Sequence, residues 1–311
     1  MNIWFGEQGL RQMAQQSAVT IGNFDGVHRG HLHILQRLQN EARARGLRSV
    51  VVVFEPQANE FFAKMRDLPA VSRLTPLRDK LRLLRDSGCV DDVLVLRFNA
   101  QFAAIEVNDF IEHFLRQGLQ TRYLLVGDDF RFGRGRVGDF DLLAAQNDFV
   151  TERTPSVLVA GTRASSTAVR QSLQAGKIEQ AQHILGHEYV LNGRVKHGKK
   201  LGRTINCPTA NIHLAQHNYA LNGVFVVDVS GDFGRKRGVA SLGVNPTVAD
   251  GTKQKLEVHI FDFHQEIYGQ RLSVHFLHKL RDEEKFADLD SMMKQIYLDM
   301  DAARAWCREE G

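Results

Sequence analysis

The chain has 311 residues, of which 43% are hydrophobic and 24% charged, and its formal net charge is +4. This length favours two domains over one, and the composition excludes a disordered or collagen-like chain. No apolar run approaches the roughly 20 residues of a membrane helix, and residues 1–10 lack the pattern of a signal peptide, so we expect a cytoplasmic protein.

Cysteine usage and charge distribution narrow the class further. Cys89, Cys207 and Cys307 are far apart and odd in number, which argues against a disulfide framework or a cysteine zinc site. The basic residues are spread out, whereas a nucleic-acid-binding protein usually carries a basic stripe with interleaved aromatic residues. We therefore expect phosphate-bearing small ligands, no nucleic-acid or membrane partner, and a monomer or weak homo-oligomer.

Strand and helix patterns alternate in the first half. Residues 49–54 form an apolar, β-branched run typical of a buried parallel strand, and Leu77, Leu81 and Leu84 repeat at helical spacing. The expected strands are residues 18–24, 49–54, 92–98, 122–127 and 156–161, and the expected helices are residues 30–44, 76–87, 108–117, 140–146 and 167–174. This alternation predicts an α/β domain with a parallel sheet, which binds ligands at the carboxyl ends of its strands.

The pattern changes after about residue 185, where strands follow one another closely. Beyond a short helix and connector at residues 177–186, the expected strands are residues 189–196, 209–212, 224–229, 237–242, 255–261 and 272–277. They predict an antiparallel β-barrel or sandwich, and we expect the barrel. A final helix at residues 286–307 carries an apolar stripe (Leu289, Met293, Ile296, Met300, Ala303) that we expect to pack on this barrel. The predicted domains are residues 1–185 and 186–311.

The most specific motif lies after the first expected strand, in the segment from Gly22 to His31 (GNFDGVHRGH). A helix N-terminus favours phosphate, and glycines there let a nucleotide approach the backbone closely. His28 and His31 can stabilise the charge that develops when pyrophosphate leaves. The segment resembles the HxGH motif of nucleotidyltransferases, which implies a Rossmann-like fold, catalytic roles for the two histidines and ATP contacts from Gly22, Phe24, Asp25 and Gly30.

Two further segments of the first half support this resemblance. Ser165, Ser166 and Thr167 with Arg170 resemble the SSTxxR element of the same family, with Ser166 as a possible helix N-cap; the resemblance implies triphosphate contacts from the hydroxyls and a catalytic role for Arg170. Residues 126–133 resemble the VGxDFRFG segment of prokaryotic FAD synthetases, which implies that Asp129 faces ATP. The overlapping GxGxxG pattern at residues 133–138 opens no helix and does not predict a dinucleotide site.

The second half carries a different phosphate-handling motif. In Pro208-Thr209-Ala210-Asn211 a hydroxyl and an amide point to one face of a strand, and such oxygen ligands suit Mg²⁺ shared with nucleotide phosphates. This segment resembles the PTAN motif of riboflavin kinases, and the loop with Gly198 and Gly202 resembles their phosphate-covering loop.

Within this kinase resemblance, Glu257 matches the glutamate that accepts a proton from the ribityl hydroxyl. His259 would be an orienting or structural residue. Residues 241–247 (SLGVNPT) and the pair Tyr268-Gly269 also fit the kinase family.

Together the motifs resemble prokaryotic bifunctional riboflavin kinase/FMN adenylyltransferases over nearly the whole chain. The resemblance implies ATP and Mg²⁺ as co-substrate and metal, with riboflavin, FMN and FAD as substrates and products. One departure is Gln57-Ala58, where the family commonly has His-Pro after the second strand. Two alternatives remain open: an adenylyltransferase whose barrel only senses flavin, and an RNA-modifying enzyme, since HxGH also occurs in class I aminoacyl-tRNA synthetases.

Overall fold

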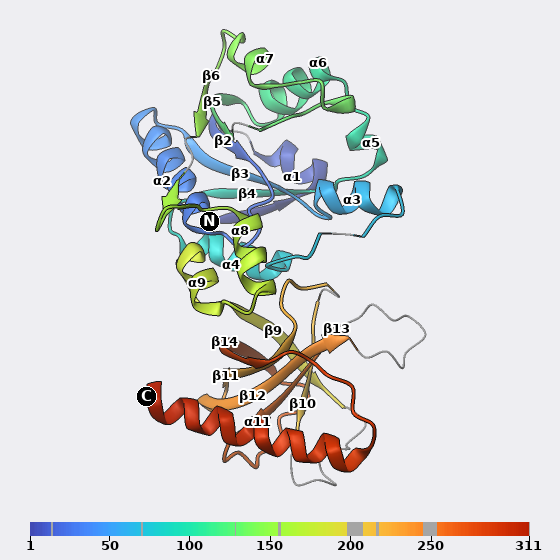
Figure 1. Ribbon diagram of the computed structural model, residues 1–311. Helices are drawn as coiled ribbons and strands as arrows, with labels where there is room; N and C mark the ends of the chain where they lie inside the picture. The colour runs from blue at the N-terminus through green and yellow to red at the C-terminus, as the bar shows by residue number, and fades with distance from the viewer. Residues whose placement is uncertain are drawn as a thin grey trace. The chain divides into compact units, whose positions relative to one another are not determined.

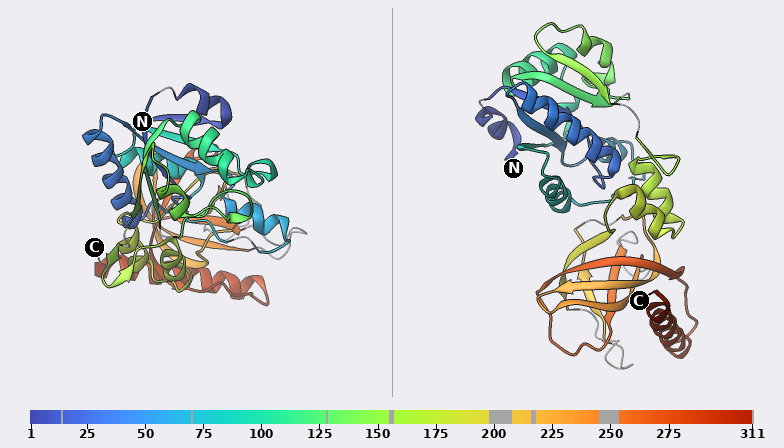
Figure 2. Two further views of the ribbon diagram at one scale, coloured as in Figure 1. Left: turned by 90° about the horizontal axis from the view of Figure 1, so that it is seen from above. Right: turned by 90° about the vertical axis from the view of Figure 1, so that its left-hand side faces the viewer.

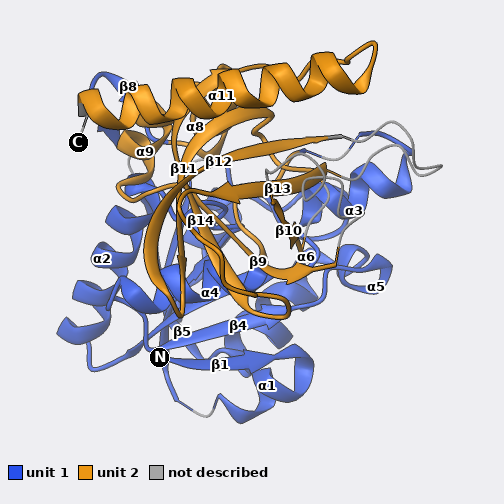
Figure 3. Cartoon of the chain, turned by 90° about the horizontal axis from the view of Figure 1, so that it is seen from below, with its two compact units in different colours: residues 1–71, 77–164 blue, residues 72–76, 165–311 orange. Residues whose placement is uncertain are grey.

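The computed structural model describes residues 1–13, 15–69, 71–127, 129–154, 157–197, 208–215, 218–244 and 254–310. The chain forms two compact units, one of Met1–Val71 with Leu77–Ala164 and one of Ser72–Pro76 with Ser165–Gly311 (Figure 3). The second unit therefore contains a five-residue segment taken from the middle of the first.

The first unit is built on a parallel sheet (Figure 1), as the alternating patterns predicted. Its strands, in the spatial order β1-β4-β3-β2-β5-β6, are β1 (Asn2–Phe5), β4 (Asp92–Leu96), β3 (Arg48–Phe54), β2 (Ser17–Ile21), β5 (Thr121–Gly127) and β6 (Val150–Thr154). Its helices are α1 (Gly6–Gln12), α2 (Arg29–Ala44), α3 (Ala58–Met65), α4 (Leu77–Asp86), α5 (Ala100–Ala103), α6 (Val107–Asp109), a π-helical continuation (Phe110–Gly118), a 3₁₀ turn (Arg134–Arg136) and α7 (Phe140–Ala144).

Alternate strand residues of this sheet enter two separate cores. On β3, Val50 and Val52 pack with Phe110 and Phe114 of the π-helical segment on one face, whereas Val51 packs with residues of α2 and α4 on the other. Successive strand side chains point to opposite faces. The β-branched run thus buries both faces of the strand.

The structure corrects several expected elements of the first unit. The last strand is β6, and the strand expected at residues 156–161 was wrong: residues 155–156 lie outside the described chain, and Leu158–Val159 (β7) pairs only with Thr162–Arg163 (β8) in a two-stranded ribbon. β6 is a partly exposed edge strand with polar side chains, so it lacks the apolar run that marks a buried strand. β1, α1 and α3 were not expected.

The second unit contains the predicted antiparallel barrel, which is closed (Figures 1 and 2). Its strands, in spatial order, are β10 (Ala210–His213), β13 (Gln254–Ile260), β12 (Gly234–Val244), β11 (Gly223–Gly231), β14 (Arg271–Arg281) and β9 (Val190–Lys196). The helix α11 (Leu289–Glu310) lies along the outside of the barrel, where Ala303 packs against Val224 and Val239. It begins three residues later than expected, because the Asp288 side chain accepts a hydrogen bond from Ser291 N (2.7 Å), as a helix N-cap does.

Two short helices, α8 (Ser166–Gln174) and α9 (Ile178–Leu185), belong by their contacts to the second compact unit. Gln182 Nε2 of α9 donates a hydrogen bond to the Phe276 carbonyl of β14 (2.7 Å). The compact units therefore divide at residue 164, before the expected boundary at residue 185. Whether the functional domains divide at residue 185 stays a prediction.

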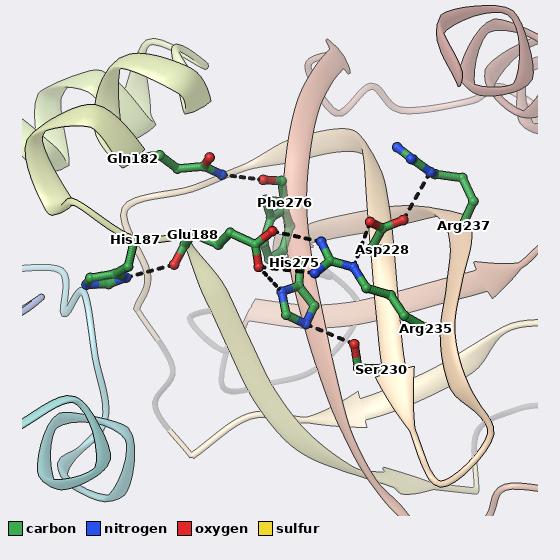
Figure 4. Close-up of polar contacts among 9 residues, drawn as sticks. All are labelled: Gln182, His187, Glu188, Asp228, Ser230, Arg235, Arg237, His275 and Phe276. Atoms are coloured by element: carbon green, nitrogen blue, oxygen red, sulfur yellow. Dashed lines mark hydrogen bonds and ion pairs between the residues drawn. The ribbon is translucent and has the colours of Figure 1, made fainter. Parts of the chain in front are cut away.

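A network of charged side chains joins Glu188, just before β9, to residues of β11, β12 and β14 (Figure 4). Glu188 forms an ion pair with Arg235 (2.8 Å) and a hydrogen bond with His275 (2.6 Å). Arg235 also pairs with Asp228 (2.8 Å), which in turn pairs with Arg237 (3.0 Å). Arg235, followed by His275, holds the pKa of Glu188 below its ordinary value.

We expect Glu188→Gln to lower the free energy of unfolding by about 1 kcal/mol or less, because solvent screens a carboxylate that is 43% exposed. A carboxyl group with a depressed folded-state pKa stabilises the fold above its unfolded pKa, and this stabilisation is lost as the pH falls through the folded value. Calorimetric midpoints of wild type and variant should therefore differ at pH 7 and converge below about pH 4.5, the ordinary glutamate pKa. Glu309→Gln, on an exposed carboxylate of α11, is the control; a pH-independent difference for Glu188→Gln would contradict the account.

Candidate active sites

The HxGH segment connects the carboxyl end of β2 to helix α2. His28 is the N-cap of α2, and its Nδ1 accepts a hydrogen bond from the backbone N–H of His31 (3.3 Å). The two imidazole rings are stacked, with centroids 3.6 Å apart and an interplanar angle of 18°. The structure thus brings the two predicted catalytic histidines together at a helix N-terminus.

This segment has no room for a side chain at one position and has unusual backbone dihedral angles at two others. A Cβ atom at Gly30 would lie 2.9 Å from the Ala164 carbonyl oxygen and 3.1 Å from the His28 ring, so a side chain does not fit. Phe24 and Val27 adopt positive φ angles of 46° and 40° without being glycines. Non-glycine residues in this region carry conformational strain, which often occurs at functional sites.

Burial controls the protonation of His31. Desolvation, followed by the charges of His28 and Lys80, lowers the pKa of His31 well below its ordinary value. His31 is therefore neutral at pH 7 until a negatively charged ligand compensates its environment. Its buried Nδ1 has no hydrogen-bond partner within the part of the chain that the structure describes.

Lys80 is a residue that the sequence analysis missed. It is fully buried in α4, and lysine is among the residue types that are seldom fully buried. The sequence does indicate that Lys80 is buried. It follows Leu77 by three residues and precedes Leu84 by four, so it lies on the apolar face of that helix.

The strand order places the HxGH segment at the switch point of the sheet. β2 lies between β3 and β5, and the chain order reverses between β2 and β5. Ligands of such sheets bind outside the carboxyl ends of the strands at this point. Gly22 and Asp25 follow β2, and the exposed Asp129 follows β5, where its carboxylate lies 3.2 Å from the position of a Cβ on Gly127.

The neighbouring strand β3 is followed by the unusual Gln57. Its backbone N–H donates to Glu60 Oε2 (2.9 Å) at the start of α3, and its side chain is buried. The departure from His-Pro is therefore accommodated as a helix N-cap.

The SSTxxR residues lie in the second compact unit, at the start of α8. Ser165, and not Ser166 as expected, is the N-cap: its side chain accepts a hydrogen bond from Ala168 N (3.1 Å). Arg170 Nε donates to the Ser72 carbonyl (2.6 Å). Thr167 is exposed. That Ser165, Ser166, Thr167 and Arg170 share a nucleotide with the histidines stays a prediction.

A cavity of about 350 Å³ opens beside strand β10 of the barrel. Thr209 and Asn211 both line it, together with the segment from Phe263 to Tyr268. The expected hydroxyl and amide therefore face one cavity. The segment 263–268 was missed apart from Tyr268, because no secondary-structure pattern marks this connection before β14.

Glu257 lies directly across from Asn211 in the pairing of β13 with β10. Side chains of directly paired residues in antiparallel strands stand on the same face, with Cβ atoms about 5 Å apart. Desolvation raises the pKa of Glu257; Lys255 opposes this rise and Glu283 adds to it. A raised pKa suits a carboxylate that accepts a proton near neutral pH.

Some of the other residues predicted for the barrel site are described by the structure, and some are not. Gly198 and Gly202, in the expected phosphate-covering loop, and residues 245–247 lie outside the described residues. His259 Nδ1 hydrogen-bonds with the Pro208 carbonyl (3.0 Å), next to Thr209, as an orienting residue would.

Comparison with known proteins assigns the two halves separately. Residues 10–168 match the family model for FAD synthetase, and residues 185–307 match the model for riboflavin kinase. The chain is 46% identical to the bifunctional riboflavin kinase/FMN adenylyltransferase of Escherichia coli strain K12, over 98% of this chain and 97% of the relative. The protein of the same name from Pseudomonas fluorescens is 42% identical, over 98% and 97% of the two chains.

A solved structure has the same fold over the full length. The crystal structure described as a macrolide-efflux protein from Streptococcus pneumoniae matches with a TM-score of 0.79 and 29% identity, covering 98% of this chain and 100% of that one. Among the described residues, no helix is both long and apolar enough to cross a membrane.

Proposed function

This chain belongs to the family of bacterial bifunctional riboflavin kinase/FMN adenylyltransferases, and we propose that it makes FAD from riboflavin in two ATP-dependent steps at separate sites. The observation that carries this proposal is the pairing of two phosphate-handling motifs in one chain. The HxGH segment begins a helix in the FAD synthetase region, and Thr209 and Asn211 line a cavity in the riboflavin kinase region.

In the kinase step, the ribityl 5′-hydroxyl of riboflavin attacks the γ-phosphate of ATP, and FMN and ADP form. Glu257 accepts the hydroxyl proton, for which its half-buried position and raised pKa suit it. The cavity beside β10 receives the nucleotide, with Gly198 and Gly202 in the loop that covers its phosphates.

Thr209 and Asn211 would hold Mg²⁺ in this step. The described residues contain no group of three or more His, Cys, Asp or Glu side chains that could hold a metal. A hydroxyl and an amide that line one cavity fit Mg²⁺, which keeps waters and takes further oxygen ligands from nucleotide phosphates. Bound there, the ion would neutralise negative charge on the phosphates.

In the adenylyltransferase step, a phosphate oxygen of FMN attacks the α-phosphate of a second ATP. The bond to the β-phosphate bridging oxygen breaks, pyrophosphate leaves and FAD forms. The N-terminus of α2 with His28 and His31 stabilises the departing negative charge. We also propose that Arg170 and the Ser165–Thr167 hydroxyls bind triphosphate, and that Gly22, Phe24, Asp25, Gly30 and Asp129 contact ATP.

Chromatography of flavins tests the proposal directly. The purified chain is incubated with riboflavin, ATP and Mg²⁺, and separately with FMN, ATP and Mg²⁺. We expect FMN and then FAD in the first reaction and FAD in the second. FAD from FMN only would favour the alternative in which the barrel senses flavin, and no flavin product in either reaction would refute the proposal.

A further inference from the structure

Gln57 carries a buried amide group that the fold leaves unpaired. Its side chain is 1% exposed, and its Nε2 has no hydrogen-bond partner within the part of the chain that the structure describes. A buried donor without a partner is costly, and such groups in native proteins often serve a function. A bound ligand that offers an acceptor atom would satisfy this donor.

The start of α3 fixes the orientation of this amide. Gln57 N donates to Glu60 Oε2 (2.9 Å), and the two residues form a capping box. In a capping box, the side-chain oxygen of the N-cap residue accepts a hydrogen bond from the backbone N–H of the third helical residue. The oxygen of the Gln57 amide therefore serves the helix, and its NH₂ group is left to donate elsewhere.

The segment that contains Gln57 lies between two others at the carboxyl edge of the sheet. β3 runs between β2 and β4 (Figure 1). On the β2 side, Gly22 N donates to the Val52 carbonyl of β3 (3.1 Å), which ties the start of the HxGH segment to this strand. On the β4 side, Glu55 N donates to the Leu96 carbonyl (2.8 Å). Gln57 thus follows the strand that separates the HxGH segment from the end of β4.

Phenylalanine rings gather at the end of β4. Phe54 of β3 contacts Phe98 and Phe102, with ring centroids 5.4 and 5.0 Å apart. Phe61 and Phe62 of α3 also contact Phe98 (5.5 and 5.6 Å). All of these rings except Phe54 are only half-buried. Aromatic side chains with a few polar groups among them are typical of pockets for planar ligands.

The strand order places three features in a row. The phenylalanines lie at the end of β4, Gln57 follows β3, and His28 and His31 follow β2. FMN has the same order of parts, which are a flat ring, a ribityl chain and a terminal phosphate. With its ring against the phenylalanines, its phosphate points toward the histidines and its ribityl phosphate chain passes Gln57. The predicted ATP contact Asp129 follows β5, on the other side of β2.

We propose that Gln57 binds the ribityl phosphate chain of FMN: its Nε2 donates to an oxygen of that chain and orients the phosphate for attack on ATP. This inference rests on the proposed adenylyltransferase step. An amide is an uncharged donor, so it orients the attacking phosphate without neutralising its negative charge. The histidine that the family commonly has at this position also offers an N–H donor.

The kinetics of FAD formation from FMN and ATP test this role. Gln57→Glu keeps the size and the capping oxygen of the side chain but replaces the donor with a second acceptor. We expect the KM for FMN to rise roughly tenfold, with the KM for ATP and the rate of riboflavin phosphorylation nearly unchanged. Gln57→His, which restores an N–H donor, should keep the KM for FMN within about threefold of the wild-type value. Gln101→Glu makes the same change at an exposed glutamine of α5 and is the matched control.

Lumiflavin, which has the flavin ring without the ribityl chain, separates the parts of FMN. Its inhibition constant in competition with FMN should be the same for wild type and Gln57→Glu, which would also show that the ring site of the variant is folded. An unchanged KM for FMN, a rise in the KM for ATP alone, or an equal loss of lumiflavin binding would overturn the inference.

The outcomes distinguish this inference from the proposed function. If the wild type makes FAD from FMN and Gln57→Glu has wild-type kinetics, the proposed function stands and the role of Gln57 is wrong. If the wild type makes no FAD from FMN, the proposed function fails and the inference fails with it.

Discussion

We expect Glu257→Gln to abolish the formation of FMN from riboflavin and to leave the conversion of FMN to FAD intact. Glutamine has nearly the same shape but cannot accept the ribityl proton, and the loss of a general base costs typically two to four orders of magnitude in rate. The residue lies in the barrel, paired with Asn211 across β10 and β13, so the substitution leaves the HxGH segment unchanged. The measurement is the initial rate of FMN formation from riboflavin, ATP and Mg²⁺.

The adenylyltransferase reaction of the same variant is the internal control. FAD formation from added FMN should proceed at the wild-type rate and show that the protein is folded. Equal loss of both reactions would contradict the assignment of the two steps to separate sites.

We expect the double variant His28→Ala/His31→Ala to have the reverse effect. It removes both stacked imidazoles and the hydrogen bond from His31 N to His28 Nδ1 at the start of α2. Loss of one donor to a developing negative charge commonly costs about two to three orders of magnitude in kcat. We therefore expect FAD formation from FMN to become undetectable, while FMN formation from riboflavin keeps its wild-type rate.

His33→Ala is the matched control, because His33 lies in the same helix and is exposed. It should leave both activities unchanged. If the folded double variant also lost the kinase reaction, or kept the adenylyltransferase reaction, the role given to the two histidines would be wrong.

The sequence predicted those strands and helices whose hydrophobic pattern matches their burial in the folded protein. The run Ser49–Phe54 is β-branched and buried on both faces, and it forms β3 within one residue of the expected start. β6 could not be found in this way, since an edge strand that keeps polar residues carries no apolar run. β1 has only four residues and is held by its pairing with β4, a contact that is remote in sequence.

Some residues of the candidate sites could be predicted from local motifs, and others could not. Short motifs predicted site roles for His28, His31, Thr209 and Asn211, because each motif lies within one strand–loop segment. Lys80 lowers the pKa of His31 and Glu283 adds to the raised pKa of Glu257, each from another element, so only the tertiary structure shows these effects. Pattern also failed at the cap of α8, where Ser165 and Ser166 are both good N-cap residues and only the observed hydrogen bond to Ala168 N decides between them.

The segment Ser72–Pro76 affects how the chain can be divided. Its carbonyl at Ser72 accepts from Arg170, and Arg73 N donates to the Asn218 carbonyl (3.0 Å), so these residues hold together parts of the second unit that are far apart in sequence. The polypeptide thus passes from one unit to the other three times, after residues 71, 76 and 164. A fragment that begins at residue 165 would lack the segment Ser72–Pro76. We therefore expect such a kinase fragment to unfold at a lower temperature than the same residues within the intact protein.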